Sequence, residues 1–192
     1  MDWQCDLLDR QKGRDMLMRA RPVAGMTLIE LLIGFAIIGI LLALGVPSFN
    51  AWLQNLQIRN AADSIFNGLQ LARANAVQRN KSVTFTMAGP ASGWTVSIDT
   101  PSALETATVQ TRSATEGTPN AVIATTAPAI TFNGLGATNL GATATIQVTN
   151  PTGGVCGSGT TNMRCLNVTV SVGGQIKMCD PLVTTVGDSR KC

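Results

Sequence analysis

The chain has 192 residues, of which 45% are hydrophobic and only 4% aromatic, and its formal net charge of +3 is too small to indicate a nucleic-acid-binding protein by itself. It contains no histidine, which excludes Ser-His and Cys-His nucleophile pairs and every imidazole metal ligand. The acidic residues form no pair at a motif spacing and no glycine-rich phosphate loop is present, so we expect neither an enzyme nor a protein with a cofactor or metal.

The first 25 residues are polar and carry charges of both signs. The last two charges before the apolar run that follows, Arg19 and Arg21, are both positive, which favours a cytoplasmic location for this end of the chain. Met16 and Met18 are alternative start residues. We therefore interpret residues 1–25 as a cytoplasmic leader.

Residues 26–46 are nearly all apolar, and a helix of that length would be about 31 Å long, close to one hydrocarbon thickness. A secretory signal peptide is the alternative, but it would have a shorter apolar run with a small-residue cleavage site after it. Here Pro47-Ser48-Phe49 follows the run, whereas the small residue Gly25 precedes it. We expect a transmembrane helix over residues 26–47, loosened at Gly39 and kinked at Pro47.

From residue 48 to residue 80 the pattern is amphipathic. Apolar side chains recur at helical spacing and polar residues fill the intervals. The apolar positions are Phe49, Trp52, Leu53, Leu56, Ile58, Ala62, Ile65, Leu69, Ala72 and Ala76. The pattern predicts a helix that continues out of the membrane segment and sets these apolar side chains against a head domain.

After residue 81 the sequence alternates between apolar and polar residues, as is typical of strands. Strands are expected over 83–87, 94–98, 106–111, 129–132, 143–149, 165–172 and 175–179. Gly89-Pro90 predicts a hairpin connection between the first two strands, and Gly173-Gly174 predicts a tight turn between the last two. Residues 112–128 are expected to form a loop with one short strand at most. One long helix followed only by strands predicts an α+β fold, in which an antiparallel sheet of residues 81–192 packs on the C-terminal half of the helix.

Four of the five cysteines lie in the last quarter of the chain: Cys156, Cys165, Cys179 and Cys192. An even set beyond a membrane segment predicts two disulfides in an oxidising compartment. Zinc binding is the alternative, but the gaps are long and no two of these cysteines have the spacing of a zinc site. Of the three pairings that four cysteines allow, we favour Cys165–Cys179 across the last hairpin and Cys156–Cys192, which would tether the tail.

The run Gly25-Met26-Thr27-Leu28-Ile29-Glu30, followed by the apolar segment, closely resembles the type III signal of type IV prepilins and type II secretion pseudopilins. The resemblance implies that a prepilin peptidase cuts between Gly25 and Met26 and methylates Met26. It also implies a single-pass inner-membrane protein with a periplasmic head, which joins other major and minor pilins or pseudopilins in a filament. Gly39 and Pro47 match pilin positions at which the helix bends or melts during assembly.

Glu30 is the candidate assembly residue. A carboxylate inside a bilayer costs about 2.5–3.5 kcal/mol on insertion scales, so a sequence that keeps one there usually has a partner for it. The resemblance implies that this partner is the N-terminal amine of the neighbouring subunit. The alternative is that Glu30 lies near the interface and extends to water.

The C-terminal run Gly174-Gln175-Ile176-Lys177-Met178-Cys179-Asp180-Pro181 resembles the signature of the GspH/FimT group of minor pilins and pseudopilins. Some members carry Gly-Arg-x-Arg before the cysteine, in a basic hairpin linked to DNA capture. Here Gln175 and Lys177 replace the two arginines, and lysine keeps a charge but not the bidentate fork. With Arg190 and Lys191 they form a candidate site for double-stranded DNA, although we favour the simpler interpretation of a solvated hairpin face.

These features together predict a minor pilin or pseudopilin that takes part in initiation or tip assembly of a type IV pilus or a type II secretion pseudopilus. DNA binding during natural transformation is the alternative function. We expect the isolated head to be monomeric, because the resemblance implies that filament contacts come mainly from the N-terminal helix.

Overall fold

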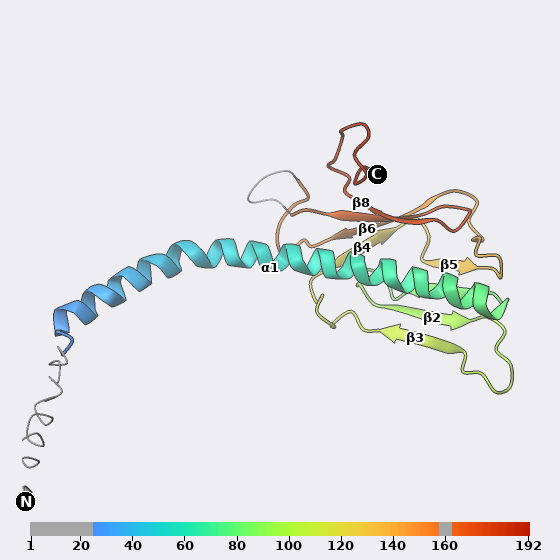
Figure 1. Ribbon diagram of the computed structural model, residues 1–192, viewed down its shortest axis with the longest axis horizontal. Coiled ribbons are helices and arrows are strands. Elements are labelled where there is room, and N and C mark those ends of the chain that lie inside the picture. Colours follow the sequence, from blue (N-terminus) through green and yellow to red (C-terminus); the bar gives the residue numbers. More distant parts are fainter. Residues whose placement is uncertain (1–24, 158–162) are drawn as a thin grey trace, which may run out of the picture. The chain divides into compact units, whose positions relative to one another are not determined.

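The computed structural model describes residues 25–157 and 163–192, so the predicted leader lies outside the described residues except for Gly25. The described part of the chain forms one helix, α1 (Leu28–Arg79), followed by eight strands (Figure 1). It divides into two compact units, one ending at Ala43 and the other running from Leu44 to Cys192, and each is described by itself.

The first unit, as far as it is described, consists of the start of α1 and the three residues before it. Its large apolar side chains, from Met26 to Leu42, are all at least 46% exposed. The helix is long and apolar enough, by length and composition, to cross a membrane. Its helical assignment continues through Gly39 and Pro47, and the bend expected there stays a prediction.

The second unit contains two antiparallel sheets of four strands each, where the sequence had led us to expect one sheet. The first has the order β3-β2-β1-β5 and consists of β1 (Val83–Met87), β2 (Trp94–Ile98), β3 (Thr108–Arg112) and β5 (Ala129–Phe132). The second has the order β4-β6-β7-β8 and consists of β4 (Val122–Thr125), β6 (Ala144–Thr149), β7 (Leu166–Val170) and β8 (Ile176–Cys179).

The division into two sheets arises at β4, the one short strand in the segment expected to be mainly loop. Strand β4 pairs with β6, whereas β5 returns to pair with β1, so the chain alternates between the sheets. The two predicted hairpins are confirmed, with the registers Met87↔Trp94 for β1 and β2 and Val170↔Ile176 for β7 and β8. The expectation of antiparallel strands packed on a long helix is confirmed as well.

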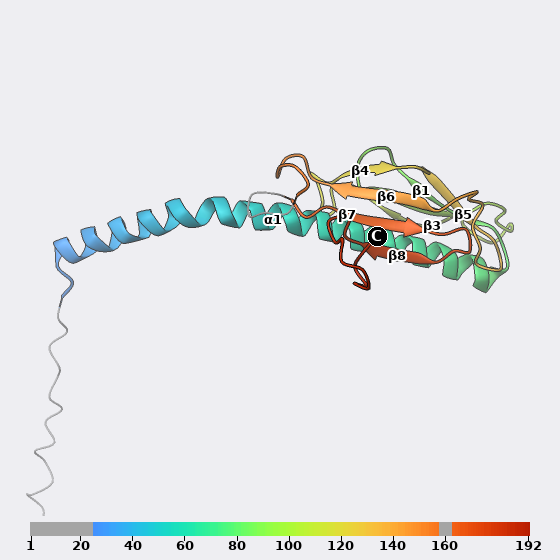
Figure 2. The ribbon, with the colours of Figure 1, turned by 90° about the horizontal axis from the view of Figure 1, so that it is seen from above.

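The core of the second unit lies between α1 and the inner faces of the two sheets (Figures 1 and 2). On α1, the fully buried side chains recur at helical spacing, at Ile58, Ala61, Ala62, Ile65, Leu69, Ala72 and Ala76. Gly68 lies over the aromatic pair of Phe85 and Trp94, whose ring centroids are 5.6 Å apart. A Cβ atom at position 68 would approach Phe85 to 2.8 Å, so the absence of a side chain lets the helix lie close to the first sheet.

The membrane-proximal part of the amphipathic segment packs differently from the prediction. Phe49 and Trp52, expected to face the head, are each 57% exposed. The head is instead contacted by Gln54, whose side-chain oxygen accepts hydrogen bonds of 2.7 Å from Asn150 and 3.3 Å from Asn120. These bonds fix the rotation of α1 about its axis, which leaves both aromatic side chains more than half exposed and places Trp52 beside a groove that Met178 of β8 also lines.

Candidate functional site

The predicted cleavage site lies in a short non-helical segment before α1. Residues 25–27 are exposed and have no regular structure, and the helix begins at Leu28. The bond between Gly25 and Met26 is therefore in irregular chain, which a peptidase can bind without first unwinding a helix. The remainder of the leader lies outside the described residues.

Glu30 closes a capping box at the start of α1. Its backbone N–H donates to Thr27 Oγ1 at 3.3 Å, and its carboxylate accepts from the backbone N–H of Thr27 at 3.5 Å. This reciprocal arrangement satisfies two backbone donors that would otherwise lack partners at the helix start. Glu30 thus has a local partner within the single chain. The sequence carries a signal for this contact, because Thr-x-x-Glu before an apolar run is typical of a capping box. The roles expected for Glu30 from the sequence were assembly or extension to water alone, and the cap was missed.

All four C-terminal cysteines form disulfides, as expected, but the favoured pairing is wrong. The bonds join Cys156 to Cys165 and Cys179 to Cys192, with Cα–Cα distances of 5.5 and 5.0 Å. The register of β7 and β8 sets Cys179 opposite Asn167, so Cys165 lies two residues away from the position that a cross-strand bridge needs.

Cys165 lies beside Cys156 because Cys156 and Met163 form an isolated parallel bridge just before β7. The backbone N–H of Met163 donates to Val155 O at 2.9 Å, and that of Gly157 donates to Met163 O at 3.1 Å. These bonds bring the two cysteines side by side. The partner of Cys165 is therefore a cysteine only 9 positions away in the sequence, and not the one that the prediction had placed across the hairpin.

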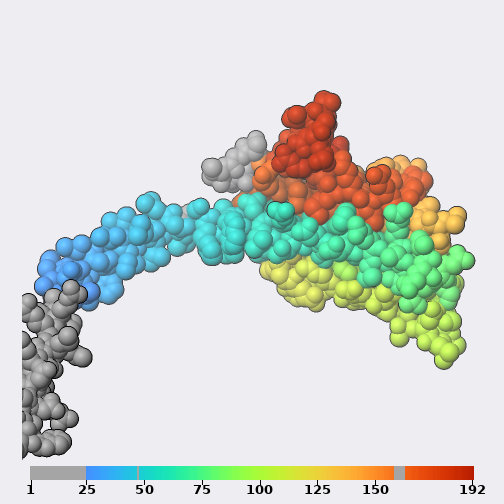
Figure 3. Space-filling view, in the orientation of Figure 1, coloured from blue at the N-terminus to red at the C-terminus, as the bar shows by residue number. Residues whose placement is uncertain are grey.

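The C-terminal tail lies along β8 and brings three of the four candidate DNA-binding residues together. The backbone N–H of Asp180 donates to Arg190 O at 2.7 Å, and the Lys177 ammonium donates to Lys191 O at 2.7 Å. The disulfide between Cys179 and the last residue closes this arrangement. Figure 3 shows residues near the C-terminus forming a projection on the surface of the second unit. The fourth candidate, Gln175, lines a separate hollow against α1.

Only part of the positive charge near the tail is free. The Arg190 guanidinium binds Asp188 at 2.8 Å, and this contact holds the pKa of Asp188 at about 2, below its ordinary value of 3.8. Arg164 binds the buried carboxylate of Asp180 at 3.0 Å. Within residues 25–157 and 163–192, no carboxylate lies within ion-pair distance of Lys177 or Lys191.

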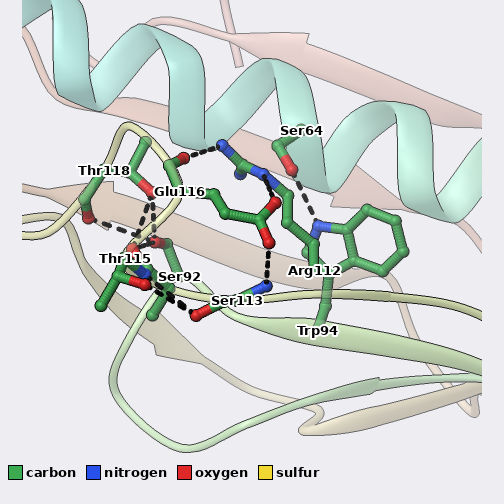
Figure 4. Close-up of polar contacts among 9 residues, drawn as sticks. Ser64, Ser92, Trp94, Arg112, Ser113, Thr115, Glu116 and Thr118 are labelled. Carbon is green, nitrogen blue, oxygen red and sulfur yellow. Dashed lines mark hydrogen bonds and ion pairs between the residues drawn. The ribbon is translucent and has the colours of Figure 1, made fainter.

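At the end of α1, before β1 and at the end of β3, by contrast, basic side chains are paired with glutamates. Arg112, at the end of β3, donates to Glu116 O at 2.6 Å and lies 4.0 Å from the Glu116 carboxylate (Figure 4). Arg79 and Lys81 both bind Glu105 at 2.7 Å. Lys177 and Lys191 thus differ from these three basic side chains, each of which has a glutamate partner, although Glu105 balances only one of its two.

A groove of about 500 Å³ runs between α1 and the tail, wholly within the second unit. Apolar and basic side chains together form its walls, and they include Trp52, Leu56, Arg59, Arg164, Met178 and Arg190. No group of three or more Cys, Asp or Glu side chains suited to a metal ion is present in the part of the chain that the structure describes.

Comparison with known proteins gives two family matches. The family described as type II transport protein GspH matches residues 61–174, which is more than half of the chain, and the prokaryotic N-terminal methylation motif matches residues 20–46. A comparison with curated proteins gives no match.

Two crystal structures of the type IV minor pilin FimU from Pseudomonas aeruginosa are similar to this structure. One is 16% identical, with 62% of this chain and 90% of that chain covered and a TM-score of 0.47. The other is 15% identical, with 66% and 91% covered and a TM-score of 0.48.

Proposed function

The chain belongs to the GspH family of pilins and pseudopilins, which are structural components, and we propose that it takes part in initiation or tip assembly of a type IV pilus or a type II secretion pseudopilus. We further propose that a prepilin peptidase cuts between Gly25 and Met26 and methylates Met26. In this proposal α1 anchors the chain in the inner membrane with its head in the periplasm, until other pilins or pseudopilins take it up.

The observation that carries the proposal is the exposed apolar surface at the start of α1. Large apolar side chains are exposed all round this part of the helix, and there is no charged side chain between Glu30 and Arg59. A contiguous apolar surface of this kind is unusual on a soluble monomer and marks a membrane or protein contact. Lipid would cover it before assembly, and neighbouring helices would cover it in a filament.

The capping box bears on the assembly role of Glu30. Losing a helix cap costs about 0.5–2 kcal/mol. If the carboxylate leaves Thr27 to pair with the amine of a neighbouring subunit, the new ion pair must contribute more than that. The low dielectric of the bilayer core favours such a pair, because an unpaired carboxylate there is itself costly. We propose that Glu30 exchanges its local partner for an intersubunit partner during assembly.

Processing is tested by comparing Gly25→Ala with Gly34→Ala in cells that carry the native prepilin peptidase. Neither glycine has an atom within 4 Å of the place where a Cβ would lie, so neither change creates a clash. We expect Gly25→Ala to keep the leader and to lower filament output, and Gly34→Ala to be cut normally. An unchanged mature mass and unchanged filament output for Gly25→Ala would refute the proposal.

The assembly role is tested by separating the charge of Glu30 from its capping function. Glutamine also serves in a capping box, so Glu30→Gln keeps the helix start but removes the negative charge. Glu30→Ala removes both. We expect both variants to be cut by the peptidase and neither to enter filaments. If Glu30→Gln enters filaments as the wild type does, the charge has no assembly role.

A second candidate function is the binding of double-stranded DNA, for which the adjacent Lys177 and Lys191 give the specific observation. Binding through so few cations would be weak and would weaken further as salt is added, because the slope of log K against log salt is about −0.9 for each phosphate neutralised. We expect the full chain in detergent to retard duplex DNA at low salt, and Lys177→Ala to reduce the salt slope by about one unit. Lys81→Ala is the matched control, since Lys81 is already paired with Glu105. Absence of retardation at low salt would reject this function.

The oligomeric state of the second unit is a separate proposal. We propose that it is monomeric in solution, since the exposed apolar surface lies mainly on the first unit and at the start of the second. Sedimentation of residues 44–192 at several concentrations tests this, with a constant monomer mass as the expected result. A mass that rises with concentration would contradict it.

A further inference from the structure

Phe49 and Trp52 form an exposed aromatic pair directly after the apolar run. Their ring centroids are 5.7 Å apart with an interplanar angle of 30°, and each side chain is 57% exposed. Leu56, one turn further on, continues the same side of α1 and is 37% exposed. The contacts of Gln54 fix the rotation of the helix here, and Trp52 and Leu56 border a groove that Met178 of β8 also lines. Two large rings are therefore presented to the surroundings by a helix whose rotation is fixed.

The segment around the pair has an unusual composition. Residues 47–58 carry no charged side chain, and the polar residues among them are a serine, two asparagines and two glutamines. The first charge after the apolar run is Arg59. Apolar rings among uncharged polar side chains suit the headgroup layer of a bilayer, where the indole ring is enriched because it has an apolar body and a polar N–H.

The distances along the helix fit the same layer. The apolar run ends at Val46, so with a rise of about 1.5 Å per residue Phe49 lies about 4.5 Å and Trp52 about 9 Å beyond it. The headgroup region adds roughly 5–8 Å to each side of the hydrocarbon core. The two rings thus lie in or at the edge of that region, whereas Arg59, about 20 Å beyond Val46, lies in water.

We propose that Phe49 and Trp52 are an interfacial anchor that binds the phospholipid headgroup boundary on the head's side of the membrane before the subunit is assembled. This inference rests on the proposed membrane anchorage. The pair is continuous with the apolar run, since Leu44 and Val46 are themselves exposed, and lipid is therefore its nearest apolar environment. The apolar run is about as long as the hydrocarbon core is thick. Rings fixed at one boundary of the core therefore keep the apolar run at the depth where it spans the core.

Tryptophan fluorescence in vesicles tests the anchor. The full chain has three tryptophans, and Trp3→Phe leaves Trp52 together with Trp94, which is only 3% exposed in the core. This variant is reconstituted into vesicles of phosphatidylethanolamine and phosphatidylglycerol that carry bromine either near the glycerol end or near the methyl end of the acyl chains. The same chain with Trp52→Phe added measures the background from Trp94. A conservative change at an exposed site should leave the fold intact.

We expect the Trp52 signal, after subtraction of this background, to be quenched at least twofold more by bromine near the glycerol end than by bromine near the methyl end. Quenching equal to the background would overturn the anchor and would mean that water or protein surrounds Trp52. Stronger quenching by bromine near the methyl end would overturn it too, because the rings would then lie in the hydrocarbon core. Flotation of the vesicles is measured first. A chain that does not float refutes the membrane anchorage itself, whereas a floating chain without quenching refutes only the anchor.

Discussion

Loss of the bond between Cys179 and Cys192 should release the tail from β8 without unfolding the head. The perturbation is the double variant Cys179→Ala and Cys192→Ala. Its matched control is Cys156→Ala and Cys165→Ala, because each pair joins one buried and one exposed cysteine. The two variants are expected to lose similar amounts of stability but to loosen different parts of the second unit.

The magnitudes follow from the loop lengths. The two cysteines of the tail bond are 13 positions apart and those of the control bond 9 positions apart. The chain-entropy relation then gives a loss of about 3 kcal/mol for the first and about 2.7 kcal/mol for the second. Domains of this size are commonly stable by about 5–15 kcal/mol, so both variants should fold. Global stability alone cannot separate them.

Native-state hydrogen exchange separates the two variants by position. The backbone N–H of Asp180 donates to Arg190 O in the tail, so its protection reports directly on tail placement. We expect this amide to exchange much faster in the tail variant than in the control, while amides of β6 stay protected in both. Equal protection of Asp180 in both variants would refute the reasoning, since the tail would then be held without the disulfide.

Three further predictions concern the rest of the second unit. Gly68→Ala should lower the free energy of unfolding, measured with denaturant, by up to about 2 kcal/mol. Overpacking against Phe85 costs about 1–3 kcal/mol, whereas the higher helix propensity of alanine contributes only about 1 kcal/mol. A gain in stability would contradict this. The pKa of Glu105 is lowered from 4.5 to about 2, first by the hydrogen bond from Lys81, so its contribution to stability should be lost as pH falls from about 4.5 to about 2. The melting temperature of Glu105→Gln should therefore depend less on pH in that window than the melting temperature of the wild type. Equal pH dependence of the two would argue against the pairing of Glu105 with Lys81. Trypsin cuts between all four C-terminal cysteines, so peptides from a non-reducing digest report the pairing. The peptide of residues 113–164 should be disulfide-bonded to that of 165–177, and the peptide of 178–190 to Cys192. Any other linkage would contradict the pairing in the structure.

Features that depend on local pattern could be predicted from the sequence. The expected helix end at residue 80 is one residue from the observed end of α1 at Arg79, and the expected strand over 129–132 coincides with β5. Apolar periodicity decides such features, because the same few neighbours both form the element and bury one of its faces. The N-terminal motif could likewise be recognised from the sequence, because its residues are contiguous.

Features that depend on register between distant segments could not be predicted. The partner of Cys165 depends on the bridge between Cys156 and Met163 and on the register that sets Asn167 opposite Cys179, and neither leaves a periodic signal. The exposure of Trp52 depends on hydrogen bonds between Gln54 and a loop almost a hundred residues away in the sequence. An apolar residue at helical spacing was expected to face the head, but polar contacts decided the rotation of the helix at this end.

The central claim, that this chain is a processed filament subunit, is tested most directly by the intact mass and N-terminal sequence of the protein taken from native membranes and filaments. The account predicts a chain that begins with N-methylated Met26 and has 167 residues, which is the full 192 less the 25 of the leader. It also predicts that this form disappears in cells without prepilin peptidase. A chain in filaments that retains Gly25, or that begins at Met26 without methylation, would contradict the account.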